Sequence, residues 1–355
     1  MGDEADRALM ARALALAAKG LYTTSPNPRV GCVVARGEKV LGEGWHVRAG
    51  LPHAERLALD DARANGHDVR GATVYVTLEP CNHTGRTPPC VDALIDAKVG
   101  RVVAAMADPN PVAAGGSARL RAAGIAVETG LLGDAAQELN PGFVSRMTRG
   151  RPWVRVKIAA SLDGRSAIAN GQSRWITGPE ARADGHAWRA RACAILTGIG
   201  TVRADNPQLT VRDVETPRQP LRVVVDSRLE MSPSARVLPA LVFSGQPGTL
   251  AKAEVLALPN ANGKVDLPRM LEALAGRGVN ELHVEAGFRL NGSLVREGCV
   301  DEFLLYLNPS FLGDAAQGML DLPATKTLDA RLRLRVVSFD RLGDDLRLLA
   351  RPAAA

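Results

Sequence analysis

The chain has 355 residues with a formal net charge of +6, and hydrophobic residues make up 46% of it. This length favours two domains, and the composition excludes a collagen-like or low-complexity protein. Aromatic residues are only 4% of the chain, which disfavours a stacking platform for single-stranded nucleic acid, whereas the basic balance favours anionic partners such as phosphorylated small molecules.

The first part of the chain alternates short β-rich segments with helical ones. After an amphipathic N-terminal helix, strands are predicted at residues 30–35, 72–78, 101–106 and 125–130, with helices at 53–66, 88–100, 117–124 and 134–140. This alternation predicts βαβ units around a largely parallel or mixed sheet. Residues 145–153 are polar and basic and contain Gly150 and Pro152, so we expect a linker there.

A second α/β pattern follows and needs a sheet of its own. Strands are predicted at residues 153–161, 193–198, 221–227, 281–287 and 302–308, and helices from Pro179 and from about Leu290, with a loop at 162–178. Residues 232–266 are interrupted by proline and glycine and show no clear pattern.

The number of cysteines and the hydropathy of the sequence indicate in which cellular compartment the protein is expected. Five cysteines are spread along the chain, which disfavours a disulfide framework and favours a reducing environment. No apolar run approaches the ~20 residues that span a bilayer, and the acidic N-terminus lacks the basic start of a signal peptide. We therefore expect a soluble, cytoplasmic protein.

Four residues suggest a catalytic metal site. His53 and Glu55 follow Pro52, Cys81 follows a predicted strand, and Cys90 begins a predicted helix. One imidazole and two thiolates suit tetrahedral Zn²⁺ with its fourth position left for water. Glu55 is then placed to move a proton from that water to a leaving amine. This order resembles the H-x-E…P-C-x-x-C signature of zinc nucleobase deaminases, except that eight residues separate the cysteines.

Other interpretations stay open at this point. His83 could complete a purely structural zinc site. A nucleic-acid base deaminase with an accessory domain would explain the zinc ligands and the basic charge, but predicts Cys-x-x-Cys spacing and basic-aromatic patches. A third interpretation is a non-catalytic zinc module joined to a dinucleotide-sensing domain, but this interpretation gives Glu55 no function. Cys32, Cys193 and Cys299 lie in apolar segments, where a packing role is favoured.

Longer motifs resemble one family. "PNPRVGCVV" (26–34), "GWHVRAGLPHAE" (44–55) and "YVTLEPCNHTGRTPPC" (75–90) resemble the deaminases of bacterial riboflavin biosynthesis. "KIAASLDGRSA", "SRWITG" and "LTGIGTVRADNPQLTVR" resemble the partner reductases, which are relatives of dihydrofolate reductase. The resemblance implies a cytidine-deaminase-like three-layer domain over residues 1–146 and a dihydrofolate-reductase-like α/β domain over residues 147–355.

The resemblance also implies a bifunctional enzyme. The first domain would hydrolytically deaminate 2,5-diamino-6-(5-phosphoribosylamino)pyrimidin-4-one with one Zn²⁺ per chain. The second would use NADPH to reduce the ribosyl group to ribityl. It further implies phosphorylated pyrimidine substrates, no nucleic-acid or membrane partner, and a homo-oligomer (dimer or tetramer) formed through the reductase domain.

Individual residues acquire roles from the same resemblance. Zinc ligation is implied for His53, Cys81 and Cys90, and proton transfer for Glu55. The deaminase pocket would include Asn27, His46, His83 and Arg86, although an ordinary turn at Asn27 and a solvated loop charge at Arg86 are the alternatives.

In the second domain the implied contacts fall into two groups. NADPH would contact Ala159, Trp175, Thr201, Asp205, Ser227, Gly287, Phe288, Arg289, Leu290, Asn291, Gly292 and Ser293. The substrate would contact Ser173, Arg189, Leu209, Arg212 and Glu285, with the arginines holding its phosphate. Asp163 would shape the site or relay a proton, or else cap a turn. The segment "VEAGFRL" (284–290) departs from the family pattern at Ala286, Phe288 and Arg289.

Overall fold

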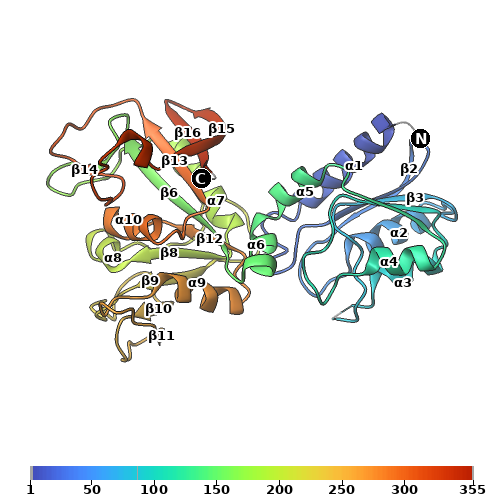
Figure 1. Ribbon diagram of the computed structural model, residues 1–355, viewed down its shortest axis with the longest axis horizontal. Helices are drawn as coiled ribbons and strands as arrows, with labels where there is room; N and C mark the ends of the chain where they lie inside the picture. The colour runs from blue at the N-terminus through green and yellow to red at the C-terminus, as the bar shows by residue number, and fades with distance from the viewer. Residues whose placement is uncertain (1–2, 86, 354–355) are drawn as a thin grey trace. The chain divides into compact units, whose positions relative to one another are not determined.

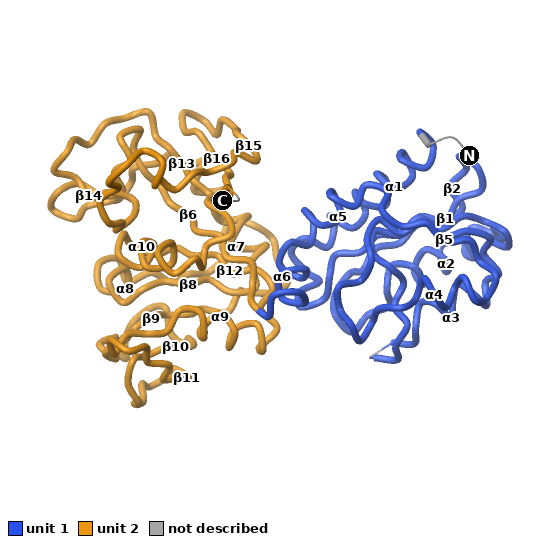
Figure 2. Tube along the Cα trace, in the orientation of Figure 1, with its two compact units in different colours: residues 1–150 blue, residues 151–355 orange. Residues whose placement is uncertain are grey.

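The chain forms two compact α/β units, each with its own sheet and core. The computed structural model describes residues 3–85 and 87–353, and the units comprise residues 1–150 (unit 1) and 151–355 (unit 2) (Figure 1, Figure 2). The predicted domain boundary at residues 146 and 147 falls inside a helix, α6 (Pro141–Arg149).

The prediction of a linker over residues 145–153 is therefore wrong for its first half. Pro141 occupies the first turn of α6, where its missing N–H costs nothing, and Phe143 is buried in the core of unit 1. Gly150 ends the helix with φ 67°, a left-handed conformation that glycine adopts without strain. The polar composition of this segment thus reflects the exposed side of a helix.

Unit 1 contains a mixed five-stranded sheet in the order β2-β1-β3-β4-β5. Strand β1 is antiparallel to β2 and β3, whereas β3, β4 and β5 are parallel. The strands are β1 (Gly31–Arg36), β2 (Lys39–Trp45), β3 (Thr73–Val76), β4 (Arg101–Ala104) and β5 (Ala126–Thr129). Strand β2 is not among the predicted elements because its sequence contains two glycines and two charged residues and lacks a strong apolar pattern.

Helices cover both faces of this sheet, as the three-layer prediction requires. Gly31 lets α1 pack against one face, since a Cβ there would lie 2.0 Å from the Ala13 carbonyl oxygen. Gly42 and Gly44 do the same for α2 on the opposite face. The helices are α1 (Asp3–Ala18), α2 (Ala54–Ala64), α3 (Cys90–Asp96), α4 (Gly116–Ala122), α5 (Gly133–Leu139) and α6.

Unit 2 contains a nine-stranded sheet in the order β11-β10-β9-β8-β12-β6-β13-β16-β15. The strands from β11 to β13 are parallel, and β16 and β15 extend the sheet in antiparallel pairing. The strands are β6 (Trp153–Ser161), β8 (Ala194–Gly198), β9 (Leu221–Val225), β10 (Ala240–Ser244), β11 (Ala253–Ala257), β12 (Glu281–Val284), β13 (Glu302–Asn308), β15 (Leu334–Leu342) and β16 (Asp345–Pro352). A separate pair is formed by β7 (Arg165–Ala167) and β14 (Gln317–Gly318).

Helices also cover both faces of the second sheet (Figure 1). Their bounds are α7 (Pro179–Arg191), α8 (Ile199–Asp205), α9 (Leu267–Gly276) and α10 (Phe288–Arg296), with a short 3₁₀ turn at Leu328–Ala330. The predicted fold class, a three-layer α/β domain followed by a second α/β domain, is confirmed. None of the helices in the described part of the chain is both long and apolar enough to cross a bilayer.

A buried ion cluster lies between α7 and the sheet of unit 2. The Arg155 side chain is 2% exposed, and its guanidinium contacts Glu302 at 2.5 Å and Glu281 at 3.1 Å. Arg191 of α7 binds the same Glu281 at 2.7 Å, and Arg351 of β16 binds the same Glu302 at 3.0 Å. Two carboxylates therefore compensate three guanidinium groups and tie β6, β12, β13, β16 and α7 together.

Glu302→Gln should destabilise unit 2 strongly. The substitution leaves the buried Arg155 with only one carboxylate, and breaking a buried pair costs about 3 to 5 kcal/mol. Urea unfolding should show this loss, with Glu272→Gln on the exposed side of α9 as the matched control. A Glu302→Gln protein as stable as the control would show that the cluster contributes nothing to folding.

Candidate functional site

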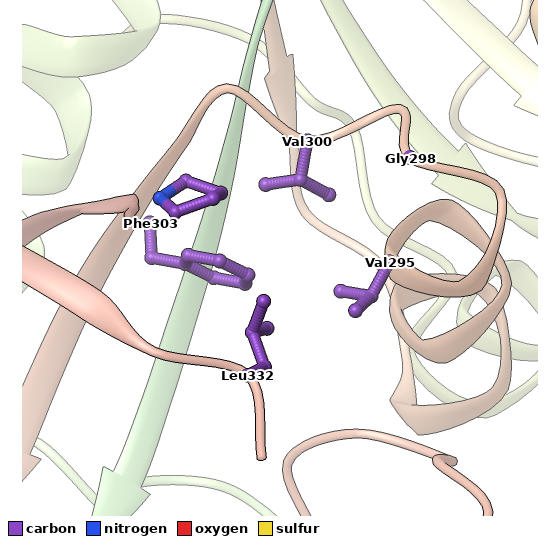
Figure 3. A pocket seen from close by; sticks show the side chains of 6 residues that line it. Val295, Gly298, Val300, Phe303 and Leu332 are labelled. Atoms are coloured by element: carbon purple, nitrogen blue, oxygen red, sulfur yellow. The ribbon is translucent and has the colours of Figure 1, made fainter. Parts of the chain in front are cut away.

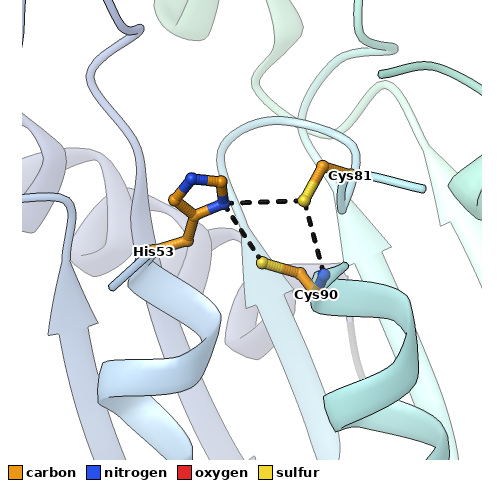
Figure 4. A group of neighbouring side chains, drawn as sticks. All are labelled: His53, Cys81 and Cys90. Atoms are coloured by element: carbon orange, nitrogen blue, oxygen red, sulfur yellow. Dashed lines mark hydrogen bonds between the residues drawn. The ribbon is translucent and has the colours of Figure 1, made fainter. Parts of the chain in front are cut away.

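Three donor atoms from separate segments meet in unit 1 (Figure 4). His53 immediately precedes α2, Cys81 lies in the loop after β3, and Cys90 is the first residue of α3. His53 Nδ1 lies 3.5 Å from Cys81 Sγ and 3.4 Å from Cys90 Sγ. The sequence-predicted ligands are thus brought together at the carboxyl side of β3, where two helices begin.

The spacing of these donors fits a tetrahedral zinc ion. With ordinary Zn–S and Zn–N bond lengths, a tetrahedral angle separates an imidazole nitrogen from a thiolate by roughly 3.6 Å. Within residues 3–85 and 87–353 the donor group contains three side chains, and His83 is not among them. The donor set is therefore that of a catalytic site with one position for water, and a structural site completed by His83 finds no support.

Electrostatics at this cluster also favour a cation. The hydrogen bond shared by the two thiols lowers the pKa of Cys81 to about 4 and raises the pKa of Cys90 well above its ordinary value. Two neighbouring thiols cannot both ionise easily on their own, because the second thiolate would face the first. A divalent cation stabilises both thiolates and removes this conflict.

Glu55 lies beside the cluster in the first turn of α2. Its side chain is 3% exposed, and burial, followed by the charge of Cys81, raises the pKa of its carboxyl to about 7. A carboxyl with this pKa can both accept and donate a proton near neutral pH. Cys32 lies behind Glu55 and is fully buried, which agrees with a packing role.

The expected pocket residues Asn27 and His46 lie next to the metal ligands. Asn27 Nδ2 is 3.1 Å from His46 Nε2, and the His46 ring stacks edge-on against His53 with centroids 5.2 Å apart. Burial lowers the pKa of His46, so its imidazole is neutral. His83 is half-buried, and its Nδ1 has no hydrogen-bond partner among the residues that the structure describes. Arg86 lies outside the described residues.

Sequence reasoning missed Asp108, a partly buried carboxyl near the same cluster. It follows β4, and burial raises its pKa to about 6, with smaller effects from Glu79 and Cys81. Its main-chain N–H donates to Glu79, which also accepts the N–H of Ser117 at the start of α4. The available signal was its position after a strand that neighbours β3, since ligands bind beyond the carboxyl ends of parallel strands.

In unit 2 the predicted substrate residues Arg189 and Glu285 form a bidentate pair. Arg189 Nε and Nη2 lie 2.5 and 2.7 Å from the two carboxylate oxygens. Burial acts to raise the pKa of Glu285, but Arg189 holds it well below its usual range. Lys157 on β6, which sequence reasoning missed, adds to this effect, and burial lowers its own pKa. Because the Glu285 carboxylate already accepts from Nε and Nη2 of the Arg189 guanidinium, Arg189 is a poor bidentate ligand for a phosphate.

The other predicted substrate residues lie in loops near this pair. Arg212 is exposed and donates to Thr210 Oγ1 at 3.1 Å. The Leu209 side chain is 3% exposed and packs in the core, so only its main chain could face a ligand. Ser173 lies in the loop before α7. The neighbouring Arg174 holds this loop against the end of α8 by donating to the Asp205 carbonyl at 2.9 Å.

Most predicted cofactor residues lie at the carboxyl ends of adjacent parallel strands. Ala159 is near the end of β6, Thr201 is in α8 after β8, and Ser227 follows β9. Gly287 precedes α10 after β12, and a Cβ on it would lie 3.5 Å from Thr201 Oγ1. Trp175 is 70% exposed in the loop before α7, where Arg182 lies 4.7 Å from its ring.

The start of α10 fits a cofactor phosphate. No side chain caps this helix at Gly287, so its first N–H groups stay open to an anion at the edge where Thr201 also lies. Among the described residues, the buried Asn291 Oδ1 has no hydrogen-bond partner, but as an acceptor it cannot bind a phosphate oxygen, and its Nδ2 already donates to the Ala286 carbonyl. The helix start beside Thr201 is therefore the feature that fits a cofactor phosphate.

Some residues of the predicted cofactor loop serve packing instead. A Cβ on Gly292 would lie 2.3 Å from the Asp321 carbonyl oxygen, so this glycine permits a close backbone approach. Ser293 Oγ donates back to the Arg289 carbonyl inside α10. Phe288 and Leu290 lie in the first turn of the same helix.

Asp163 caps a neighbouring loop. Its carboxylate accepts N–H groups of Leu312 and Gly313 and the Ser161 hydroxyl. These contacts agree with the turn-capping alternative.

Comparisons with known proteins agree with both halves of the molecule. The model of the cytidine and deoxycytidylate deaminase zinc-binding region matches residues 3–106, and the RibD C-terminal domain matches residues 152–348. The riboflavin biosynthesis protein RibD of Haemophilus influenzae is 45% identical over 98% of this chain and 97% of its own. RibD of Escherichia coli is 44% identical over 97% and 98%, respectively.

Solved structures give the same result over the full length. RibD of Acinetobacter baumannii superposes with a TM-score of 0.90 at 39% identity and covers 99% of this chain and 100% of its own. A Thermotoga maritima protein described as a diaminohydroxyphosphoribosylaminopyrimidine deaminase/5-amino-6-(5-phosphoribosylamino)uracil reductase has a TM-score of 0.91 at 33% identity, with 99% of both chains covered. With matches of this identity and coverage across both units, the chain belongs to the RibD family of riboflavin biosynthesis proteins.

Proposed function

We propose that this chain is a bifunctional enzyme of riboflavin biosynthesis. Unit 1 hydrolytically deaminates 2,5-diamino-6-(5-phosphoribosylamino)pyrimidin-4-one, and unit 2 then uses NADPH to reduce the ribosyl group of the product to ribityl. The observation that carries the proposal is the meeting of His53, Cys81 and Cys90 beside the buried Glu55, in a chain that matches RibD proteins over both units. A nucleic-acid base deaminase is not favoured, because unit 2 matches the RibD C-terminal domain.

In unit 1 we assign His53, Cys81 and Cys90 to a Zn²⁺ ion, which when bound supplies an activated water molecule. Glu55 accepts the proton of that water on its carboxylate and donates it to the amino nitrogen that leaves as ammonia. Its pKa of about 7 suits both transfers. The neutral His46 and its partner Asn27 form the adjacent wall, where they can hydrogen-bond the pyrimidine ring.

In unit 2, NADPH supplies the hydride. The open N-terminus of α10 binds a cofactor phosphate, and Thr201 lies beside it. We assign binding of the substrate phosphate to Arg212, because Glu285 already accepts from two N–H groups of the Arg189 guanidinium. The ionised Glu285 is an acceptor for sugar hydroxyls, and Arg189 keeps it charged and oriented.

Each unit carries one activity in this proposal, with the deaminase in residues 1–150 and the reductase in residues 151–355. We also propose a cytoplasmic location. Its support is that all five cysteines are free thiols and that two of them serve a metal, which a reducing compartment favours.

We further propose that the chain forms a homo-oligomer through unit 2. The edge strand β15 exposes Leu334, Val336 and Phe339 by 39%, 55% and 61%. A bulge after Val336 keeps these three side chains on one face of the strand. An unpaired edge strand with an apolar face is an aggregation hazard unless something covers it, and a second copy would do so.

An apolar cleft continues this face of the sheet (Figure 3). It is lined by Val295, Gly298, Val300, Phe303, Leu332 and Pro352. Leu332, which is 47% exposed, links the cleft to β15. The apolar lining of the cleft and the exposed apolar side chains of β15 support burial between two copies.

Glu55→Gln should abolish deamination and leave reduction intact. Glutamine cannot transfer the proton, so ammonia release should fall by about 10²- to 10⁴-fold. Bound zinc, measured by elemental analysis, and NADPH oxidation with separately deaminated substrate should equal the wild type. Glu38→Gln, the same change on the surface of unit 1, is the control. Ammonia release at the wild-type rate would remove Glu55 from the mechanism.

Removal of the metal should separate the two activities. A strong chelator should stop ammonia release, because His53, Cys81 and Cys90 lie in unit 1, while NADPH oxidation with deaminated substrate continues. Added Zn²⁺ should restore the first activity. Persistent ammonia release by metal-free protein would contradict the zinc assignment.

Val336→Arg should dissociate the oligomer by placing a charge in the apolar face of β15. Light scattering coupled to gel filtration should show the wild type at two or four times the mass of one chain and the variant at a lower mass. Val112→Arg, a 68% exposed position in unit 1, is the matched control. A monomeric wild type, or an unchanged Val336→Arg oligomer, would rule out this interface.

A further inference from the structure

The segment at residues 209–213 of unit 2 has no helix or strand of its own, yet side chains hold its backbone in place. The Thr210 carbonyl accepts a hydrogen bond from Arg189 at 3.0 Å. The N–H and C=O of Val211 pair with the side-chain amide of Gln219 at 2.8 and 3.1 Å. Two consecutive residues of this loop are thus fixed from two directions.

His186 makes the third contact, at the next residue. It lies on α7 with its side chain 9% exposed. Its Nδ1 accepts the main-chain N–H of Arg212 at 3.3 Å, and its Nε2 lies 3.3 Å from the Arg212 guanidinium and 3.4 Å from Asp213 Oδ2. A neutral imidazole has one acceptor nitrogen, and we assign it to Nδ1, which accepts the main-chain N–H of Arg212. Nε2 then carries the hydrogen toward Asp213 Oδ2, and its approach to the Arg212 guanidinium, which can only donate, is a contact and not a hydrogen bond.

We propose that neutral His186 is a positioning residue that holds Arg212 in place for the substrate phosphate, and that protonation of His186 weakens phosphate binding. The inference rests on the proposed reductase function of unit 2. Without an acceptor at Nδ1, the Arg212 N–H loses its partner and the backbone of this residue is released. A protonated ring has no acceptor there, and its charge repels the guanidinium that it contacts.

The charged groups around His186 come from three elements. Arg189 lies on the same helix, Arg212 and Asp213 lie on the loop, and Glu285 follows β12. Burial is the largest effect and lowers the pKa of His186 below its ordinary value, the arginines lower it further, and the two carboxylates oppose them. The ring is therefore neutral at neutral pH and gains a proton only in acid.

Two variants test the proposal by steady-state reduction of the deaminated, phosphorylated substrate at saturating NADPH. His186→Leu fills the space without an acceptor and should raise the KM roughly 10-fold at neutral pH, with kcat unchanged. His186→Asn keeps an acceptor near the Nδ1 position and should retain the wild-type KM. His67→Asn, a histidine change in unit 1, is the control. With the same substrate lacking its phosphate, wild type and His186→Leu should have equal KM values.

The pH profile provides a readout that a merely structural residue would not move. As the pH falls from neutral to about 5.5, the wild-type KM should rise relative to that of His186→Asn, which cannot titrate. The ratio of the two removes the titration of the phosphate itself. A wild-type KM in His186→Leu, a loss that persists without the phosphate, or an identical acid rise in His186→Asn would overturn the inference.

The proposal and the function beneath it fail in different ways. If the wild type does not oxidise NADPH with this substrate, the reductase assignment fails. If circular dichroism shows that His186→Leu is unfolded, the comparison of wild type with His186→Asn across pH decides the matter.

Discussion

The close approach of two buried thiols and an imidazole nitrogen is the constraint on which unit 1 depends. His53 Nδ1 and the Sγ atoms of Cys81 and Cys90 lie within 4.8 Å of one another, where burial and mutual repulsion oppose two thiolates. A cation resolves that conflict, because it stabilises both thiolates. Burial also raises the pKa of Glu55 to about 7, which suits the proton transfer that we propose for it.

In unit 2, side chains of opposite charge compensate buried charges. Glu281, His283 and Glu285 alternate along β12 and its end, so all three face α7. Burial of the two carboxylates is tolerated because arginines from neighbouring elements compensate them: Arg155 pairs with Glu281, and Arg189 pairs with Glu285. The ion cluster and the proposed substrate site therefore lie on the same face of one sheet, and α7 contributes an arginine to each.

Much of the secondary structure was predictable because its signal is local. Strand β6 begins and ends at the predicted residues, and α1, α2 and α7 lie where periodicity and proline placed them. The misses have physical causes. The polar surface of α6 resembled a linker, and β10 and β11 lay in a segment broken by proline and glycine. Strand β16 joins the sheet by pairing with β13, and β15 pairs with β16, so their place in the sheet depends on pairing between strands that no local pattern records.

By itself the sequence determined which chemical groups are available in each half. The first half contains a histidine, two cysteines and a carboxylate in ordered motifs, and the second half contains motifs that resemble the partner reductases. Only the tertiary structure decided how these groups are used. It brought the three metal donors to distances that fit a zinc ion, and it paired the Arg189 guanidinium with Glu285. It also placed His186 and Asp108 beside the candidate sites, which no motif around either residue indicates. The reason is that side-chain identity is local, whereas distance, burial and charge compensation depend on segments that only folding brings together.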